Sequence, residues 1–509
     1  MKRLFSAVLL SVLLSCADSP KQPVPIDLEE LTIASIHQAY QNGEYNSQQL
    51  VQAYLDRIDK LNPSINAITY INENALEVAK ELDEKMVENY ELKPLHGIPI
   101  IVKDNINVKG MPTTAGSMAL LNYYPEENAF IIQKLREAGA IILAKSNMAE
   151  WAFSPMHTES ATHGTTRNPY NLDYVPAGSS GGTAASIAAN MGAVGLGTDT
   201  GNSIRGPSSH NSLVGFRTTL GLISRSGIVP LMLRNDVVGP MCRTVEDATR
   251  VMEVMVGYDL TDNITQYSKG KTTNNYRQYL SKNGLEGSRI GVLRELMDEN
   301  TDPEITKLFD NALSELKDLG AEVIDPIEVP NFRELSEDQW CSTFKKDLAT
   351  FLEQYVQSDS LQTLEDIIKI GTSSEFTKGR LEAYTSHTGR WGRAQTECLD
   401  AYQDSRRIAF RNAIRTVMDS LELDAIVYPS WNNRPARIDR FEEEYRGDNN
   451  QVIAPHTGQP AFTVPMGFLT NNLPAGIQFL GRMYDEATLI KLAYAYEQGT
   501  AHRKAPELD

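Results

Sequence analysis

The chain has 509 residues, of which 41% are hydrophobic and 22% charged, so a disordered or fibrous protein is excluded. Its 66 acidic residues outnumber its 48 Lys and Arg residues, and the net charge of −18 disfavours nucleic acid as a partner, because a phosphate backbone is repelled. Four cysteines are too few for a disulfide-dense scaffold, and the sequence contains neither CxxC nor HExxH. No metal site is therefore expected.

Residues 1–15 have the pattern of a secretory signal. Lys2 and Arg3 precede an apolar run at residues 4–14, which is shorter than the about 20 residues that a membrane-spanning helix needs. Cys16 completes the sequence Leu-Leu-Ser-Cys, which resembles a bacterial lipobox, whose cysteine is lipidated and becomes the new N-terminus. A plain signal peptide with an incidental cysteine is the alternative. We predict an exported protein held in the bacterial cell envelope by this lipid alone, with its folded domain in the periplasm or outside.

The segment that follows is expected to be a tether. Residues 16–27 are polar and rich in proline, and residues 28–509 form the folded domain. Removal of residues 1–15 would change the net charge to −20. Once Cys16 is modified, three cysteines remain, and the sequence predicts no disulfide between them. They are Cys242, Cys341 and Cys398.

From residue 28 onwards, helical and strand patterns alternate. Helices are expected at residues 45–60, 73–89, 127–138, 181–191, 244–256 and 303–319, within 335–420, and at 486–499. Strands are expected at residues 98–103, 140–144, 193–197, 289–293, 321–325, 424–428, 460–467 and 475–480. This alternation predicts an α/β fold with a single large domain, in which a mixed, twisted β-sheet is sandwiched by helices.

Three polar residues stand where strands end or a helix begins. Lys103 ends the apolar strand at 98–103, Ser179 lies at the start of the helix at 181–191, and Ser203 lies in a loop after a strand. In a parallel α/β unit, the C-terminal ends of strands and the N-terminal ends of the following helices share one edge of the sheet. We therefore expect the three side chains to meet at that edge.

These residue types suit nucleophilic catalysis. A serine nucleophile needs a base within hydrogen-bond reach, and a buried lysine with a depressed pKa can be that base. The Gly-rich turns at 178–182 and 197–203 leave backbone N–H groups available for an oxyanion. Taken singly, each residue has a simpler interpretation: Lys103 as a solvated lysine, Ser179 as a helix cap, and Ser203 as a turn residue.

Several motifs together carry a family resemblance. They are the strand ending in Lys103, Gly-Ser-Ser-Gly-Gly at 178–182, Gly-Thr-Asp-Thr-Gly-Asn-Ser-Ile-Arg at 197–205, Gly-Leu-Ile-Ser-Arg at 221–225, Val-Gly-Pro at 238–240, Gly-Gln-Pro-Ala at 458–461 and Leu-Pro-Ala-Gly-Ile-Gln at 473–478. With these motifs the chain resembles the amidase signature family. The resemblance covers most of residues 30–500 and is strongest over 96–247.

The resemblance implies the amidase signature fold and a Ser–cis-Ser–Lys triad. Ser203 would attack the amide carbonyl, and Ser179, held by a cis peptide bond, would relay the proton to neutral Lys103. Water would then hydrolyse the acyl-enzyme to release an acid, after ammonia or an amine has left. No metal or organic cofactor is implied, and the partner is a small-molecule or peptide amide.

The resemblance also implies roles for the residues around the triad. The oxyanion hole would consist of the backbone N–H groups of Thr200, Gly201, Asn202 and Ser203. The supporting residues would be Ser180, Asp199 and Arg205. We interpret the last two as an ion pair that shapes the nucleophile loop.

The chain departs from the family pattern at two positions. Asn202 stands where the family usually has a glycine before the nucleophile, and Ala177 replaces the first glycine of Gly-Gly-Ser-Ser. Asparagine tolerates a left-handed backbone better than most residues, so we expect the turn at Asn202 to persist. Its side chain is expected to narrow or polarise the acyl pocket.

Three other functions are compatible with parts of the sequence. Gly178-Ser179-Ser180-Gly181-Gly182 also satisfies GxSxG, so an esterase could use Ser180 with Asp424 and His456, but the segment before it reads as a loop rather than a strand. A lipid-anchored solute-binding protein would explain the lipobox but not the two Ser/Gly turns. A tRNA-dependent amidotransferase subunit shares the motifs, but export and a charge of −20 oppose it.

The substrate and the oligomeric state stay open at this level. Substrate choice is expected to come from the variable segment at 330–400. Its aromatic residues could line an apolar pocket, although their spacing is more typical of a helix core. They are Trp340, Phe344, Phe351, Tyr355 and Trp391.

Overall fold

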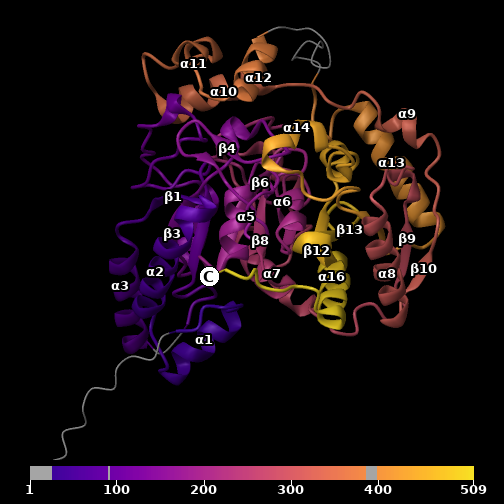
Figure 1. Ribbon diagram of the computed structural model, residues 1–509, viewed down its shortest axis with the longest axis horizontal. Helices are drawn as coiled ribbons and strands as arrows, with labels where there is room; N and C mark the ends of the chain where they lie inside the picture. Colours follow the sequence, from indigo (N-terminus) through magenta and orange to yellow (C-terminus); the bar gives the residue numbers. More distant parts are fainter. Residues whose placement is uncertain (1–25, 90–91, 386–397, 509) are drawn as a thin grey trace, which may run out of the picture.

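The computed structural model describes residues 26–89, 92–385 and 398–508 (Figure 1). The predicted signal at residues 1–15, Cys16 and most of the tether lie outside these ranges, as does Trp391. Within them, no helix has both the length and the apolar composition that crossing a membrane requires.

The described residues form one large α/β domain. Its strands are β1 Ile68–Ile71, β2 Pro99–Lys103, β3 Ile141–Ser146, β4 Glu159–Ser160, β5 Gly164–Thr165, β6 Val194–Asp199, β7 Val214–Arg217, β8 Val237–Cys242, β9 Arg289–Val292, β10 Glu322–Ile324, β11 Ala425–Pro429, β12 Ala461–Leu469 and β13 Leu473–Leu480. Its helices are α1 Ile33–Asn42, α2 Ser47–Ile65, α3 Ala75–Asn89, α4 Phe130–Glu137, α5 Gly181–Ala188, α6 Arg205–His210, α7 Val245–Met255, α8 Pro303–Asp318, α9 Phe332–Ser336, α10 Phe344–Phe351, α11 Leu364–Ile370, α12 Glu375–Thr385, α13 Ser405–Ser420, α14 Phe441–Glu444, α15 Ala454–Thr457 and α16 Glu486–Thr500.

Eleven of the strands form a single mixed sheet, in the order β1-β3-β2-β6-β8-β7-β12-β13-β11-β9-β10. β2 runs parallel to both β3 and β6, whereas β6 pairs with β8, and β12 with β13, in antiparallel fashion. Helices flank this sheet, which confirms the predicted fold class (Figure 1).

The strands at the centre of the sheet follow from their composition. Every residue of β2 and of β6 is buried, as expected for parallel strands covered on both faces. α5 is also buried all round, and it can pack this tightly because its residues are small. A Cβ atom at Gly182, for example, would lie 2.2 Å from the carbonyl oxygen of Asn147. The strand–helix–strand unit therefore fixes the beginning of α5 against the end of β3.

Three strands of the large sheet were not predicted from the sequence: β1, β7 and β8. β8 contains Gly239 and Pro240, a pair that is typical of a turn. A Cβ atom at Gly239 would lie 2.1 Å from the carbonyl oxygen of Phe216, so the glycine allows the close approach of β7. Tertiary packing therefore overrides the local turn signal at this position.

Helices α10, α11 and α12 form a cap at one end of the domain, which we call the lid (Figure 1). Its apolar residues pack against residues of the body in a cluster separate from the main core. Phe344 of α10, for example, contacts the rings of Trp151 and Phe153 at centroid distances of 6.2 and 4.9 Å.

The prediction of no disulfide is wrong, because Cys341 and Cys398 are joined by one. They are 57 residues apart in sequence, and the lid lies between them. The chain returns after the lid to its starting point, which brings the two Cα atoms within 5.5 Å of each other. Such a long-range return leaves no signal in the local sequence. Cys242 is a buried free thiol.

Candidate active site

Lys103 and Ser179 meet at the edge of the sheet where β2 ends and α5 begins. Nζ of Lys103 lies 2.7 Å from Oγ of Ser179, and both side chains are fully buried. The peptide bond between Gly178 and Ser179 is cis, in agreement with the resemblance. The C-terminal ends of β2 and β6 adjoin because Val102 pairs with Leu196 in parallel register.

The environment of Lys103 lowers its basicity. Burial lowers the pKa of Lys103 to about 7, and the carboxylates of Asp199 and Asp236 offset only part of that effect. Its hydrogen-bond partners are neutral: Ser179 Oγ, and Thr198 through Oγ1 at 2.8 Å and the carbonyl oxygen at 3.4 Å. A large fraction of this lysine is therefore uncharged near neutral pH.

A second buried lysine on the neighbouring strand provides a contrast. Lys145 of β3 is also fully buried, but its Nζ lies 3.5 Å from a carboxylate oxygen of Asp104. It also donates to the carbonyl oxygen of Ile106 at 2.6 Å and to Oγ1 of Thr113 at 3.0 Å. Burial also lowers the pKa of Lys145, to about 8, but Lys145 has a carboxylate partner, whereas the hydrogen-bond partners of Lys103 among the described residues are all neutral.

Ser203 lies in the loop between β6 and α6, and its Oγ donates to Oδ1 of Asn202 at 3.3 Å. Among the described residues, none of the backbone N–H groups of Gly201, Asn202 and Ser203 has a hydrogen-bond acceptor. Three adjacent donors beside a serine hydroxyl have the composition of an oxyanion hole. The loop carries no side chain at Gly201, where a Cβ atom would lie 3.0 Å from Trp340 and 3.3 Å from Oε1 of Gln451.

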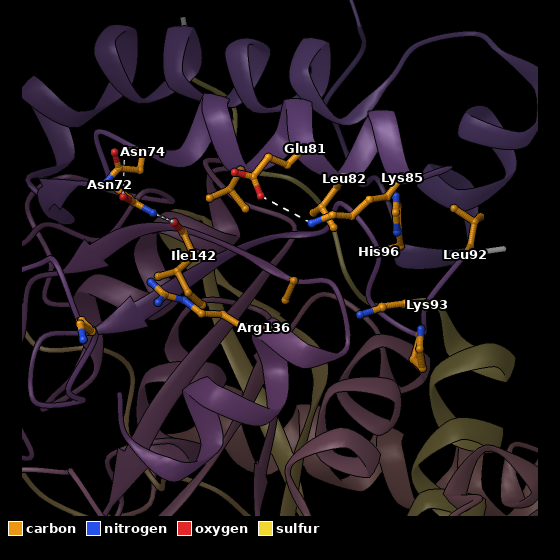
Figure 2. Close-up of a pocket in the computed structure, with 14 residues that line it drawn as sticks. Asn72, Asn74, Glu81, Leu82, Lys85, Leu92, Lys93, His96, Arg136 and Ile142 are labelled. Carbon is orange, nitrogen blue, oxygen red and sulfur yellow. Dashed lines mark hydrogen bonds and ion pairs between the residues drawn. The ribbon is translucent and has the colours of Figure 1, made fainter. Parts of the chain in front are cut away.

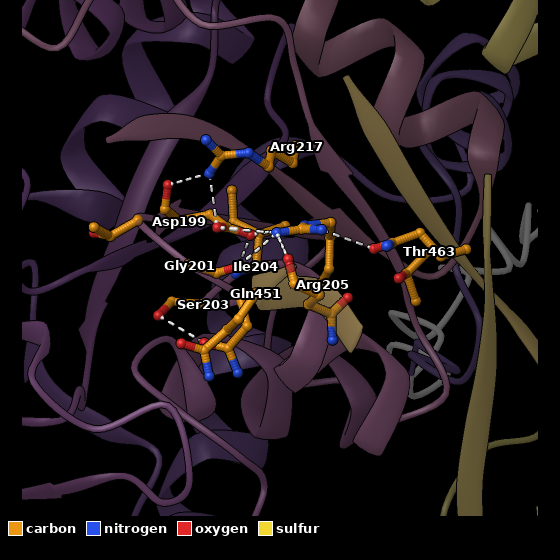
Figure 3. A network of polar contacts seen from close by, with 12 residues as sticks. Asp199, Gly201, Ser203, Ile204, Arg205, Arg217, Gln451 and Thr463 are labelled. Atoms are coloured by element: carbon orange, nitrogen blue, oxygen red, sulfur yellow. Dashed lines mark hydrogen bonds and ion pairs between the residues drawn. The ribbon is translucent and has the colours of Figure 1, made fainter. Parts of the chain in front are cut away.

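A fully buried ion network holds this loop in place (Figure 3). Asp199 accepts from Nε of Arg205 at 3.0 Å and from Nη1 of Arg217 at 2.8 Å. Arg205 also donates to the carbonyl oxygens of Gly201 at 2.7 Å and Asn450 at 2.9 Å. Burial alone would raise the pKa of Asp199, but the two guanidinium groups hold it below its ordinary value. The predicted ion pair of Asp199 with Arg205 is confirmed, and Arg217 is an additional partner.

The backbone conformation differs from the expectation at Ala177 and Asn202, the two positions that depart from the family pattern. Ala177, not Asn202, adopts the left-handed conformation, with φ of 61°. The side chain of Asn202 is accommodated because its Nδ2 donates to the carbonyl oxygen of Pro155 at 3.2 Å. The turn before Ser203 therefore needs no left-handed residue at position 202.

The residues of the rival esterase do not come together. Oγ of Ser180 donates to the carbonyl oxygen of Thr198 at 3.2 Å, and the segment before it is a loop rather than a strand. Asp424 accepts the backbone N–H of Arg289 at 2.8 Å. The ring of His456 packs against Trp340, with a centroid distance of 4.6 Å.

A narrow cavity of about 60 Å³ opens on Ser203. Its lining includes residues of the nucleophile loop, Trp340, and the lid residues Arg380 and Tyr384. Of the other aromatics considered from the sequence, Phe344 and Phe351 are in the lid core, and the hydroxyl of Tyr355 accepts the backbone N–H of Gly227 at 3.0 Å. Of these aromatic residues, Trp340 therefore lines the cavity, whereas Phe344, Phe351 and Tyr355 do not.

A larger hollow of about 850 Å³ lies elsewhere, between α3 and the beginnings of β2 and β3 (Figure 2). Its walls include Glu81 and Lys85 of α3, which form an ion pair at 3.6 Å, and Arg136 of α4. None of the site residues expected from the sequence lines it.

Sequence reasoning missed several residues of the site. Thr198 contacts Lys103, and Asp236 accepts from Oγ1 of Thr200 at 2.6 Å and from the backbone N–H groups of Leu231 and Met232. Asp236 and Arg217 are far from the nucleophile loop in sequence and belong to no recognised motif. Thr198 could have been found, since it lies within the motif at 197–205.

Comparisons with known proteins agree with this geometry. A family model described as Amidase matches residues 49–490. A probable amidase of Arabidopsis thaliana is 35% identical over 499 residues, covering 94% of this chain and 92% of that protein. One subunit of the glutamyl-tRNA(Gln) amidotransferase of Thermoanaerobacter pseudethanolicus is 34% identical over 500 residues, covering 95% of this chain and 99% of that protein. The crystal structure of the peptide amidase from Stenotrophomonas maltophilia has a TM-score of 0.83 at 33% identity, covering 94% of this chain and 99% of that one.

Proposed function

The chain belongs to the amidase family of amide hydrolases, and we propose that it cleaves the amide bond with Ser203 as nucleophile, Ser179 as proton relay and Lys103 as base. The observation that carries this proposal is the contact of 2.7 Å between Ser179 and a lysine whose pKa is lowered to about 7. A lysine that is partly neutral at working pH can accept a proton, which an ordinary surface lysine cannot.

The proposed reaction balances protons at each step. Ser203 gives its hydroxyl proton to Ser179 as that residue passes its own proton to Lys103, and Oγ of Ser203 forms a bond to the amide carbon. The carbonyl electron pair moves onto oxygen, where the backbone N–H groups of residues 200–203 stabilise the charge. The C–N bond then breaks, the nitrogen takes a proton from Ser179, and Lys103 returns one. Water repeats the sequence to release the acid.

The substrate is proposed to be a small-molecule or peptide amide. The lining of the cavity beside Ser203 combines apolar and aromatic side chains with polar ones and with Arg380, and the structural relative from Stenotrophomonas maltophilia is a peptide amidase. A role as an amidotransferase subunit is not proposed, because the net charge of −18 disfavours a tRNA substrate.

Labelling of the full-length chain with a fluorophosphonate probe tests the nucleophile. We expect one labelled peptide, modified at Ser203, because the probe reacts with activated serine hydroxyls. Mass spectrometry locates the modified residue. The Ser180→Ala variant should keep the label, and Lys103→Met should lose it. Label on Ser180, or no label on folded protein, would contradict the assignment.

We also propose that the protein is exported and anchored to the bacterial cell envelope by a lipid on Cys16. Lys2, Arg3 and the apolar run at residues 4–14 support export. The disulfide between Cys341 and Cys398 supports it independently, since disulfides persist in oxidising compartments and are rare in the cytosol.

Replacing Cys16 by serine tests the anchor. In a bacterial host fed radiolabelled palmitate, the wild-type chain should be labelled and sediment with membranes, because acyl chains on the cysteine hold it there. The Cys16→Ser variant should carry no label. Cys242→Ser, which changes a buried free thiol, is the matched control and should keep the label. An unlabelled wild-type chain would refute the lipid anchor.

A further inference from the structure

We propose that the side chain of Asn202 makes this site selective for amides over the matching esters. It does so by accepting a hydrogen bond from the leaving nitrogen during the attack of Ser203. This inference rests on the proposed role of Ser203 and adds a residue that determines specificity.

The carboxamide of Asn202 has a fixed orientation. Its Nδ2 donates to the carbonyl oxygen of Pro155 at 3.2 Å, a bond that only the nitrogen end of the carboxamide can make. Gly206 leaves space for this group, since a Cβ atom there would lie 2.8 Å from Nδ2 of Asn202 and 3.0 Å from the ring of Trp431. Only 1% of the asparagine is exposed. Oδ1 is therefore held on the side of Ser203.

Oδ1 of Asn202 depends on the nucleophile for its hydrogen bond. Among the described residues its one donor is the hydroxyl of Ser203, at 3.3 Å. When that hydroxyl gives its proton to Ser179, the donor disappears. The side chain lines the cavity, so the substrate is the group placed to supply a new donor. A buried acceptor without a hydrogen-bond partner costs free energy. The loss of the donor from Ser203 therefore raises the barrier of the step that forms the acyl-enzyme.

The substituents of the attacked carbon decide which atom can supply a donor. Once Oγ of Ser203 is bonded to this carbon, the other substituents are the oxyanion, the acyl carbon and the leaving atom. The oxyanion is itself an acceptor and is directed to the backbone N–H groups, while the acyl carbon has no polar hydrogen. Only the leaving atom remains. An amide nitrogen carries hydrogen and can donate to Oδ1, whereas an ester oxygen carries lone pairs and is repelled by it.

Gln451 adds a second acceptor on the same side of the loop. Its Nε2 donates to Oδ2 of Asp448 at 2.9 Å and also to the hydroxyl of Tyr445, which directs Oε1 away from those groups. Oε1 lies beside Gly201, 3.3 Å from where a Cβ atom would stand, and Gln451 lines the cavity. The surroundings of Ser203 are thus rich in acceptors, and a leaving group with hydrogens on its nitrogen suits them.

Matched substrates that share one acyl group test the inference. 3-Phenylpropanamide and methyl 3-phenylpropanoate form the same acyl-enzyme, and their acyl group carries no N–H that could donate to Oδ1, so the ratio of their kcat/KM values reports only the leaving group. We expect Asn202→Gly and Asn202→Leu each to lower the amide-to-ester ratio by about 10- to 100-fold, because both remove the acceptor. Leucine keeps the branched shape of asparagine, with the same number of side-chain heavy atoms, whereas glycine removes the side chain.

The two variants separate the acceptor from a steric effect. If the amide-to-ester ratio falls only in Asn202→Gly, the side chain acts by filling space and not as an acceptor, and the inference is wrong. An unchanged ratio in both variants also overturns it. The ratio is insensitive to general damage to the loop, because the backbone N–H groups serve both substrates equally. Ser203→Ala is measured in parallel: if it retains hydrolysis of both substrates, the proposed nucleophile fails rather than the role of Asn202.

Discussion

Replacing Ser203 by alanine is expected to lower kcat/KM for amide hydrolysis by at least ~10⁴-fold. The variant loses the atom that forms the acyl-enzyme, so no rearrangement of neighbouring groups can replace it. Residual rate would come from the backbone N–H groups and from binding alone. The measurement is steady-state hydrolysis of an amide by the purified variant, compared with the wild-type chain.

A matched serine in the adjacent helix provides the control for folding. Ser208 of α6 is buried and its Oγ has no hydrogen-bond partner among the described residues, so Ser208→Ala removes a buried hydroxyl without touching the site. It should keep wild-type activity to within a few-fold. Thermal unfolding of both variants shows whether the fold persists. A folded Ser203→Ala chain with full activity would exclude the acyl-enzyme mechanism.

Replacing Lys103 by methionine is expected to lower kcat by about 10²- to 10⁴-fold, the usual contribution of a general base. Methionine fills much of the same buried space without a titratable group. Lys103→Arg is the informative second variant, because a guanidinium stays protonated and cannot accept the proton of Ser179. Both variants should therefore be impaired, although only one removes the positive charge. Arginine restoring activity would show that charge, and not basicity, is what matters.

The pH profile gives a second test of the same residue. Burial lowers the pKa of Lys103 to about 7, and only the neutral amine acts as a base. The wild-type kcat/KM should consequently rise as pH increases through about 7 and level off above it. In Lys103→Met this limb should disappear. A wild-type profile that stays flat between pH 5 and 9 would contradict a neutral lysine base.

The position of Lys103 and Ser203 at one edge of the sheet was predictable because it follows from strand direction. Lys103 ends a wholly apolar strand, and Ser203 follows another, so parallel pairing of β2 with β6 brings both to one edge of the sheet. The helix at Ser179 begins at the same edge. Predicting these positions needs no knowledge of side-chain contacts, because the apolar runs and the polar residues that follow them show where each strand ends.

The supporting groups were not predictable in the same way. Arg217 belongs to β7, which is too short to be recognised from the sequence. Asp236 directly precedes β8, whose Gly-Pro pair is typical of a turn. The disulfide between Cys341 and Cys398 was predicted to be absent. Their proximity depends on how the lid packs against the body through its own apolar cluster.

The sequence by itself determined the fold class, the single large domain and the family to which the chain belongs. Those features rest on periodic apolar runs and on contiguous motifs, both of which are local. Only the tertiary structure decided what surrounds the reacting groups. It made Lys103 a lysine with a pKa of about 7, placed the left-handed backbone at Ala177, and directed the oxygen of Asn202 towards Ser203. Desolvation and hydrogen-bond geometry depend on residues distant in sequence, so they arise only when the sheet, the loop and the lid come together.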